Sequence, residues 1–556
     1  MKQDGNNDIF SVRNTFLRLK RDSSRWSVIS LVIVFFIALP VISIVVNLMG
    51  GPGETWGHLV KYLLPLYISN SLYLIVVCTL MTLFFGVTSA WLVARYEFPL
   101  RKLADWLLIL PLAIPSYITA YAYAGVFDFG GSFTKILISL GIEPMRFDIM
   151  NRFGLAFVLS VSLFPYVYVS ARAFFVNEAG NLLEASKMLG VGEFKSFFKL
   201  ILPLARPAVI AGLILVLMEV LNDYGAATYF GVSTFTTGIF RSWFSLEEPE
   251  TAIYLSAILL CIVFAVLLFE KWQRRHKQYT HSGGGNRLIS RKKTSKRTGL
   301  LVLFLVFVPI TLGFLVPIFQ LFYWSYFTFE KVFDSTFIAL SLKSLGIALL
   351  TALLTVLFAT ALIFATRWNK LGFIKNISKL SILGYAIPGA VVAIGIMIPT
   401  LALDKWLIRV LHTHFGITSG LIINGTIFAL IYAYIVRFLA VAYNPIESAG
   451  LKISNTISDA SRTLGIGNFK TFYKIEFPLI KTGLLGAFIL VFIDVLKELP
   501  LTLILKPYNV NTLAVKAYEY ASDELIMEAA VPSLFIVFTA LVPVIFLSRF
   551  LGINNR

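Results

Sequence analysis

The sequence predicts an all-α polytopic membrane protein with about 12 transmembrane helices, arranged as two parallel six-helix repeats. Three observations lead to this fold class. The composition is 58% hydrophobic and only 14% charged, whereas soluble domains hold about 25% charged residues. Apolar segments of membrane-spanning length follow one another along almost all of the 556 residues. One long sequence motif occurs twice, at the same place in each half of the chain. A soluble multidomain protein is thereby excluded.

Twelve segments meet the requirement for a transmembrane helix, which is about 20 predominantly apolar residues. In approximate bounds they are 27–48, 66–91, 104–126, 153–175, 206–222, 252–270, 299–325, 344–366, 380–402, 421–442, 482–500 and 529–548. An even number of spans places both termini on one side of the membrane. Most of the 48 lysines and arginines precede the first span, occupy the even-numbered connections or follow the last span. Because basic residues accumulate on the cytoplasmic side, we expect both termini to be cytoplasmic.

This pattern divides the chain into four parts. They are a cytoplasmic N-terminal segment (1–26), a first six-helix half (27–270), a linker (271–298) and a second six-helix half (299–550). The linker contains ten basic residues, no acidic residue and three consecutive glycines, Gly283 to Gly285. A basic patch of this kind can bind nucleic acid, but a basic cytoplasmic connection between two membrane halves is the simpler interpretation. We therefore expect contact with membrane lipid and no nucleic-acid partner.

The cysteine, histidine and glycine patterns indicate no reaction catalysed by the chain itself. The two cysteines, Cys78 and Cys261, both lie in apolar segments, which excludes a cysteine-based zinc cluster. Of the five histidines only His412 and His414 are closely spaced, and we interpret them as solvated residues of an outer loop. The dipeptide Gly-Lys does not occur, so the phosphate-binding loop of an ATPase is absent. The sequence therefore predicts a protein that is not an enzyme, with no cofactor of its own and no assigned metal ligands.

A repeat with a spacing of 272 to 275 residues relates the two halves. Residues 184–203 read EASKMLGVGEFKSFFKLILP, and residues 459–478 read DASRTLGIGNFKTFYKIEFP. A second landmark, Ala-Ile-Pro, occurs at 113–115 and again at 386–388. Each half therefore has six spans in the same order and orientation, which is a parallel repeat about an axis along the membrane normal.

Each repeated segment follows the fourth span of its half, on the predicted cytoplasmic side. The first copy contains two helix-forming stretches separated by Gly190-Val191-Gly192, where glycine permits a turn. Its apolar residues are Leu189, Val191, Phe194 and Phe198. Because exposed apolar patches mark partner sites, two such helical hairpins predict a partner with twofold symmetry. A surface turn packed on its own helix bundle is the alternative.

The repeated motif resembles the one that marks inner-membrane permeases of bacterial ATP-binding cassette importers: Glu-Ala-Ala, three residues, Gly, nine residues and Ile-x-Leu-Pro. The matching residues of the first copy are Glu184, Ala185, Ser186, Gly190 and Pro203. Those of the second copy are Asp459, Ala460, Ser461, Gly465 and Pro478. The chain departs from the pattern at the third position, where both copies have serine, and at Asp459, which keeps the carboxylate on a shorter side chain. The resemblance covers roughly residues 60–275 and 335–550.

The resemblance implies the fold and the partners of that family. The fold would be that of a type I ABC importer permease, with the first span of each half peripheral to the other ten. The two loops would be ATPase-coupling loops that dock on two copies of a separate ABC ATPase, which uses ATP and Mg²⁺. A periplasmic substrate-binding protein would deliver the cargo. The expected location is the inner (plasma) membrane of a bacterium.

Four carboxylates lie in register at the fifth spans of the two halves. Glu219 corresponds to Asp494 in the repeat. Asp223 corresponds to Glu498, again at a spacing of 275. Within each half the two acids are four residues apart, so both project from one helix face. A charge inside a membrane span costs about 2.5–3.5 kcal/mol and is usually functional. The sequence therefore predicts a cation pathway; the alternative is that these acids pair with Lys497 or another base.

The sequence around these acids resembles the ferric-iron branch of the permease family. The matching segments are 223–244 (DYGAATYFGVSTFTTGIFRSWF), 494–505 (DVLKELPLTLIL) and 511–534 (NTLAVKAYEYASDELIMEAAVPSL). Iron(III) is a hard cation that prefers oxygen ligands, which agrees with carboxylates and tyrosines. The resemblance therefore implies an Fe³⁺ importer whose permease is fused to double length. Import of thiamine, a polyamine or a phosphonate by the same architecture is the alternative, and an ion-driven secondary transporter is a second one.

Overall fold

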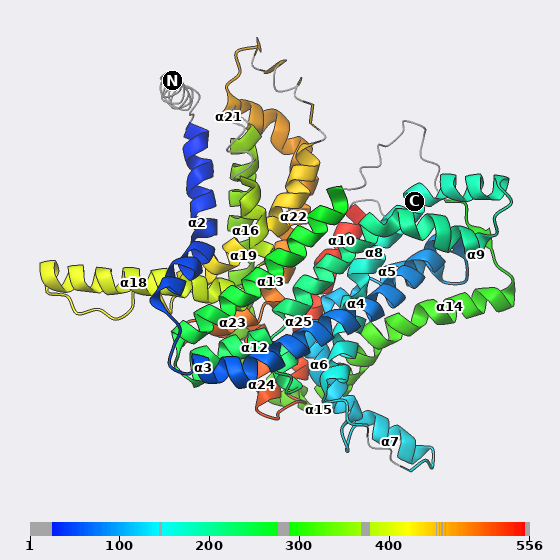
Figure 1. Ribbon diagram of the computed structural model, residues 1–556, viewed down its shortest axis with the longest axis horizontal. Coiled ribbons are helices and arrows are strands. Elements are labelled where there is room, and N and C mark those ends of the chain that lie inside the picture. The colour runs from blue at the N-terminus through cyan, green and yellow to red at the C-terminus, as the bar shows by residue number, and fades with distance from the viewer. Residues whose placement is uncertain are drawn as a thin grey trace, which may run out of the picture. The chain divides into compact units, whose positions relative to one another are not determined.

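Long apolar helices make up most of the protein, as a computed structural model shows (Figure 1). The structure describes residues 25–143, 147–275, 289–367, 378–451, 453–454, 456, 460–461 and 463–550. In these ranges the strands are the two-residue segments β1 (Tyr96–Glu97) and β2 (Lys292–Lys293), which pair in parallel. The predicted all-α polytopic fold is therefore confirmed.

The helices group into two compact units. The 47–339 unit also includes residues 513–541, and the 340–512 unit also includes the described residues up to Val46 and from Val542 onward. The helices of the 47–339 unit are α3 (Trp56–His58), α4 (Leu64–Arg95), α5 (Arg101–Leu107), α6 (Ser116–Phe127), α7 (Ser132–Ser139), α8 (Arg152–Met188), α9 (Glu193–Ser196), α10 (Leu202–Asn222), α11 (Gly225–Tyr229), α12 (Phe235–Phe240), α13 (Pro249–Arg275), α14 (Lys296–Ile310), α15 (Val316–Val332), α24 (Leu513–Ser522) and the first part of α25 (Ala530–Phe550). Those of the 340–512 unit are α2 (Arg25–Asn47), most of α16 (Ser335–Arg367), α18 (Gly389–Phe415), α19 (Ile427–Gly450), α21 (Asn468–Thr471), α22 (Phe477–Lys497) and α23 (Pro500–Leu505).

Each unit includes helices that sequence order assigns to the other half. The first span of the chain, α2, packs in the 340–512 unit, where a Cβ added at Gly395 of α18 would lie 2.5 Å from the Pro40 carbonyl oxygen. Conversely, α14 and α15 pack in the 47–339 unit, where the Tyr123 hydroxyl of α6 donates a hydrogen bond to the Leu312 carbonyl between them. The compact units therefore do not coincide with the two halves of the sequence repeat.

Most of the predicted spans correspond to long helices. Ten described helices are long and apolar enough to cross a membrane, and a bent pair raises the number to 11. The twelfth predicted span, 529–548, corresponds to α25. The third, predicted at 104–126, is not one continuous helix, because the segments Arg101–Ala113 and Ser116–Ser139 are bent by 96° where they meet.

The Ala-Ile-Pro landmark causes this break and a second one in the other half. Ile114 has extended backbone (φ −98°, ψ 116°) between a 3₁₀ turn and α6. Ile387 has nearly the same conformation (φ −78°, ψ 125°) and interrupts the ninth predicted span, 380–402. In both cases the proline that follows disfavours helical backbone at the isoleucine. The repeat is therefore present in local geometry as well as in sequence.

The tenth span begins later in the structure than predicted. Its helix, α19, starts at Ile427 and not near residue 421. Asp404 of α18 is fully buried and accepts hydrogen bonds from the backbone N–H groups of Ile422, Ile423 and Asn424 at 3.0, 2.8 and 2.8 Å. These bonds hold 422–424 as a loop, because the N–H groups are engaged by a side chain.

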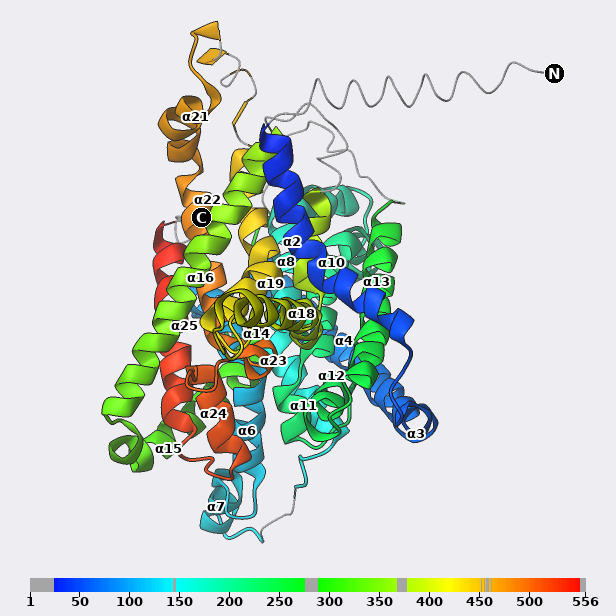
Figure 2. The same cartoon turned by 90° about the vertical axis from the view of Figure 1, so that its left-hand side faces the viewer.

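Close helix packing in the 47–339 unit sets the direction of the elements that carry the candidate site. A Cβ at Gly86 of α4 would lie 2.7 Å from the Cβ of Val167 on α8. A Cβ at Gly212 of α10 would lie 2.7 Å from the Tyr166 carbonyl oxygen, which also belongs to α8. Small residues permit such approach between membrane helices. Both views show α7 extending away from the rest of this unit (Figures 1 and 2).

Candidate functional site

The first repeat loop, residues 184–203, begins where α8 ends in a glycine cap. The Leu189 N–H donates to the Ala185 carbonyl at 3.2 Å, and the Val191 N–H donates to the Ser186 carbonyl at 2.9 Å. Gly190 between them has φ +70°, a conformation that side chains with a Cβ rarely adopt. This is a Schellman cap, and it explains why glycine occupies the invariable position of the motif in this copy.

The second repeat loop, residues 459–478, has the same local geometry. The Leu464 N–H donates to the Ala460 carbonyl at 3.2 Å, and the Ile466 N–H donates to the Ser461 carbonyl at 3.1 Å. Gly465 has φ +75°. Asp459, predicted as part of this loop, lies outside the described residues. The motif therefore specifies one backbone arrangement in both halves.

Both loops continue through a short helix and a π-helical turn into the fifth span. In the first loop these are α9, the turn Phe197–Ile201 and α10, which has Pro203 in its first turn. In the second loop they are α21, the turn Phe472–Glu476 and α22, which has Pro478 in its first turn. Proline cannot donate a backbone hydrogen bond, and each of these prolines follows within two residues of the π-helical turn, where the regular i→i−4 pattern is interrupted.

The serines that replace the alanine of the family motif are buried. The Ser186 hydroxyl donates to the Leu183 carbonyl at 2.9 Å. The Ser461 hydroxyl lies 2.6 Å from that of Thr471, which ties the two arms of the second loop together. Glu184 and Ala185 are exposed, as is Ala460. The serine departures therefore face inward in both loops, and the exposed Ala185 and Ala460 keep the residue of the family pattern.

The predicted apolar residues of the loops are largely exposed. Leu189 and Phe194 are each 79% exposed, and Phe198 is 51% exposed. In the second loop Leu464 is 78% exposed, and Tyr473, which corresponds to Phe198, is 66% exposed. Val191 is only partly exposed. The two loops thus present large apolar side chains at equivalent positions.

An ion-pair cluster that the sequence did not indicate attaches the linker to the first loop. Glu193 at the start of α9 pairs with Arg95 at the end of α4 and with the Lys292 ammonium at 3.1 Å. Lys292 belongs to β2, whose partner strand β1 directly follows Arg95. The second loop has Asn468 at the position of Glu193. The cluster is therefore particular to the first loop, and its members are too far apart in the chain for a spacing pattern to reveal them.

Glu193→Gln is expected to loosen the end of the linker, because Arg95 is only 3% exposed and would lose its carboxylate partner. A hydrogen bond to a charged group contributes about 1.5–3 kcal/mol, so the population of the open form should rise at least about tenfold. Limited trypsin digestion of the protein in membranes measures this as faster cleavage within 289–298. Glu330→Gln, at an exposed acid on α15, is the control. Equal cleavage of both variants and the wild type would contradict the prediction.

In the first half, the predicted pathway residue Asp223 lies directly after α10 and is only 9% exposed. Its carboxylate accepts a hydrogen bond from the Ser116 hydroxyl at 2.6 Å and one from the Ala227 N–H at 2.9 Å. Its backbone carbonyl accepts a third, from the Thr236 hydroxyl at 2.6 Å. Within the described ranges Asp223 forms no ion pair. Glu219, one turn earlier, is partly buried.

In the second half, both predicted pathway residues pair with a base. Glu498 is 6% exposed, and its carboxylate lies 3.4 Å from the guanidinium of Arg437 on α19. It also accepts a hydrogen bond from the Leu501 N–H at 3.2 Å. Asp494 lies 2.8 Å from the Lys497 ammonium. For this half, the geometry matches the alternative in which the acids pair with Lys497 and another base.

One repeat position accounts for part of this difference between the halves. Ser116, the donor to Asp223, corresponds to Gly389 in the second half. A Cβ at Gly389 would lie 2.2 Å from an Arg437 guanidinium nitrogen and 2.7 Å from a carboxylate oxygen of Glu498. Glycine is therefore required where the arginine enters, and serine supplies a hydroxyl where no arginine is present.

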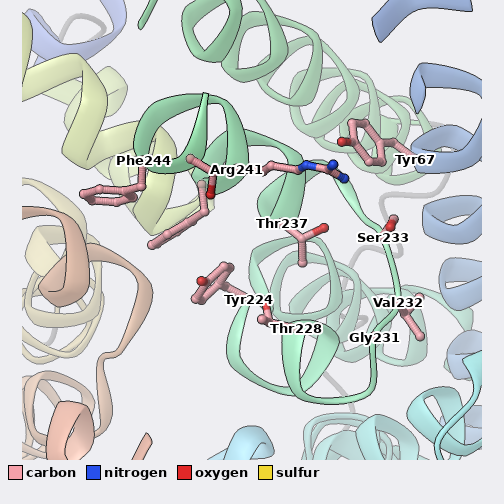
Figure 3. A pocket seen from close by; sticks show the side chains of 11 residues that line it. Tyr67, Tyr224, Thr228, Gly231, Val232, Ser233, Thr237, Arg241 and Phe244 are labelled. Carbon is pink, nitrogen blue, oxygen red and sulfur yellow. The ribbon is translucent and has the colours of Figure 1, made fainter. Parts of the chain in front are cut away.

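A pocket with a volume of about 320 Å³ lies next to Tyr224, the residue that follows Asp223. Tyr67 of α4 lines it from one side, and the segment between α10 and α13 forms the rest of the lining (Figure 3). Its lining residues are Tyr67, Tyr224, Thr228, Gly231, Val232, Ser233, Thr237, Phe240, Arg241, Phe244 and Ser245. Most polar groups are hydroxyls, and Arg241 is the charged residue of the lining. Sequence reasoning did not find this pocket, although most of its residues lie in the 223–244 segment that resembles iron permeases.

Two acidic residues, Glu247 and Glu248, follow the pocket in sequence, and the second is engaged elsewhere. Glu248 accepts hydrogen bonds from the hydroxyls of Thr251 and Thr55 at 2.7 and 2.5 Å and from the Thr55 N–H at 3.1 Å. The Thr251 and Thr55 hydroxyls hold the pKa of Glu248 below its usual value. Across the described part of the chain, no group of three or more His, Cys, Asp or Glu side chains is placed to hold a metal ion.

Comparison with known proteins finds one family in both halves. The family described as binding-protein-dependent transport system inner membrane component matches residues 82–278 and 360–556. A relative named Fe(3+)-transport system permease protein FbpB 2, from Haemophilus influenzae, is 27% identical over 87% of this chain and 89% of its own length. The sulfate transport system permease protein CysT of Escherichia coli is 30% identical over 26% of this chain and 51% of its own length. The spermidine/putrescine transport system permease protein PotB of Haemophilus influenzae is 26% identical over 41% of this chain and 78% of its own length.

Proposed function

Since the chain belongs to the family of binding-protein-dependent transport system inner membrane components, we propose that it is the permease subunit of an ATP-driven importer of ferric iron. The observation that supports ferric iron as the cargo is the length of one alignment: the Fe(3+) permease aligns with 87% of the chain, across both halves. The sulfate and polyamine permeases align with 26% and 41%. A polyamine is the second candidate cargo, because it is also a cation and its permease aligns over 78% of that protein's length.

The proposed partners are two copies of an ABC ATPase and a periplasmic substrate-binding protein. The two repeat loops support the first partner, because each presents exposed apolar residues on a backbone held by a glycine cap. In this proposal both loops and both termini face the cytoplasm, and ATP with Mg²⁺ is used by the partner ATPase alone. ATP binding draws the loops together and opens the permease to the loaded binding protein, and hydrolysis resets it.

The proposed cation pathway includes the four carboxylates Glu219, Asp223, Asp494 and Glu498. The environment of Asp223 supports its place there, because its carboxylate is held by two neutral donors and by no described base. A buried carboxylate of this kind keeps an attraction for a passing cation, whereas the charge of Glu498 is offset by Arg437. Asp223 is therefore the strongest of the four candidates.

Asp223→Asn is expected to lower the iron uptake rate at least about tenfold, equivalent to about 1.4 kcal/mol, without loss of protein from the membrane. The substitution removes the charge but keeps an oxygen that can accept from Ala227. Uptake of ⁵⁵Fe(III) by right-side-out vesicles measures the effect. Asp334→Asn is the control, because Asp334 is an exposed acid that accepts only local hydrogen bonds from Thr336 and Phe337. Normal uptake by Asp223→Asn would show that the residue is structural.

Reconstituted transport tests the proposed function itself. The chain is placed in proteoliposomes with its ATPase and binding protein, and ⁵⁵Fe(III) uptake is followed with and without ATP. Excess thiamine, spermidine and sulfate are added as competitors in separate samples. Uptake that requires ATP and is unaffected by all three competitors is expected. ATP-driven uptake of spermidine or another competitor with none of iron would keep the permease and overturn the cargo, and uptake driven by an ion gradient would overturn the ATP-driven class.

A further inference from the structure

The pocket next to Tyr224 offers hydrogen-bond donors and a positive charge. Ser, Thr and Tyr hydroxyls line it together with Arg241, and none of the lining residues carries a carboxylate. The side chain of Arg241 is exposed and forms no ion pair with any residue in the described ranges. A guanidinium with five N–H donors and no acidic partner is suited to bind oxygen anions, often through two parallel hydrogen bonds. A bare metal cation is disfavoured, because the only charge in the lining has the same sign.

Tyr67 presents a fixed donor to the same space. The residue is 2% exposed, and its ring is held against α12, where a Cβ at Gly238 would lie 2.6 Å from a ring carbon. Its hydroxyl lines the pocket and forms no hydrogen bond with the described part of the protein. Figure 3 shows the guanidinium of Arg241 extending toward the Tyr67 hydroxyl from the opposite wall. Because this hydroxyl faces the pocket with no protein acceptor, a ligand that accepts its hydrogen bond would be stabilised there.

The repeat places a base at the same position in both halves. At the spacing of 275 residues that relates Asp223 to Glu498, Arg241 corresponds to Lys516. The Lys516 ammonium lies 3.9 Å from a carboxylate oxygen of Glu519, whereas Arg241 pairs with no acid in the described ranges. The positive charge of the first half is therefore the one left available to a ligand.

We propose that this pocket binds an oxyanion, a carboxylate or an inorganic anion such as phosphate, through the Arg241 guanidinium and the Tyr67 hydroxyl. This inference rests on the proposed function in one respect: if the cargo is iron(III), the anion is one that coordinates it, and iron passes with an oxygen-donor ligand. The volume of about 320 Å³ is about ten times the share of one water in the liquid, about 30 Å³. A polyatomic anion, alone or with a bound metal, therefore has room.

Equilibrium binding to the full-length chain in lipid nanodiscs tests the proposal. The probes are [¹⁴C]citrate and [³²P]phosphate, each alone, and [¹⁴C]citrate with equimolar iron(III). Arg241→Gln is expected to weaken binding of the recognised probe at least about tenfold. Tyr67→Phe, which keeps the ring packing and removes only the hydroxyl, is expected to weaken it about 2- to 13-fold. Arg152→Gln is the matched control, since Arg152 is an exposed arginine of the same unit that lies over the Tyr73 ring.

The outcomes separate the two sources of the anion. Binding of a probe without iron that Arg241→Gln weakens supports the proposal with a free anion as ligand, and binding of citrate only together with iron supports it with the ferric complex. No binding of any probe, or equal binding by Arg241→Gln and the wild type, overturns it. Anion binding in a chain that transports no iron contradicts the proposed function alone. Iron transport with no anion binding contradicts the pocket alone.

Discussion

Arg437→Met is expected to lower the free energy of unfolding by about 3–5 kcal/mol, the cost of leaving one charge of a buried ion pair without its partner. The two side chains of this pair are only 5% and 7% exposed, so water cannot replace the guanidinium beside Glu498. Methionine is an unbranched apolar side chain of similar length, so the substitution leaves only a small cavity and adds little further loss of stability. Unfolding of the purified protein in mixed micelles, followed by circular dichroism against denaturant, measures the change.

A double substitution separates the charge from the packing. Arg437→Met combined with Glu498→Gln is expected to recover most of the lost stability, because neither residue then carries a buried charge. Lys497→Met is the matched control: the pair of Lys497 with Asp494 is 26% and 18% exposed, and exposed pairs contribute about 0–1 kcal/mol. If Arg437→Met unfolds at the same denaturant concentration as the wild type, the buried pair does not stabilise the unit.

Leu189→Asp combined with Phe194→Asp is expected to reduce ATP-driven uptake by at least about thirtyfold while the chain still inserts and folds. Each side chain is 79% exposed in the isolated subunit, so the change costs little stability. In the docked complex both would be buried, and loss of a buried apolar anchor costs about 2 kcal/mol or more per residue. Co-purification of the ATPase subunit and the uptake rate in vesicles measure docking and function separately.

Phe129→Asp is the matched control for this variant. Phe129 is an equally large apolar residue, 75% exposed, in the loop between α6 and α7, and the substitution is the same. It should leave ATPase binding unchanged. Normal uptake by the Leu189→Asp, Phe194→Asp variant would favour an ion-driven transporter, since such a protein needs no docked ATPase.

The parts of the protein that depend on short stretches of chain could be predicted from the sequence. Membrane-spanning helices follow from local composition, because each buries its own backbone hydrogen bonds and needs only apolar side chains against lipid. The repeat loops follow from a motif of 20 residues, in which Gly190 and Gly465 take the same positive φ. The helix breaks at Ile114 and Ile387 also lie in a landmark that the sequence showed, although their effect on the third and ninth spans was not predicted.

The sequence by itself determined that this is a two-fold repeated membrane permease with paired loops, because those properties follow from composition and from motifs whose residues are close together in the chain. Only the tertiary structure decided that α2 packs in the 340–512 unit, that Glu193 meets Arg95 and Lys292, and that Glu498 is buried against Arg437. The pocket that Arg241 lines is another feature that only the tertiary structure revealed. Each of these contacts depends on which helix faces pack against each other. The order of charges along the chain does not show whether two of them meet across helices or stay apart. Packing therefore selects the partner, and the partner decides whether a carboxylate attracts a cation or is offset by a base.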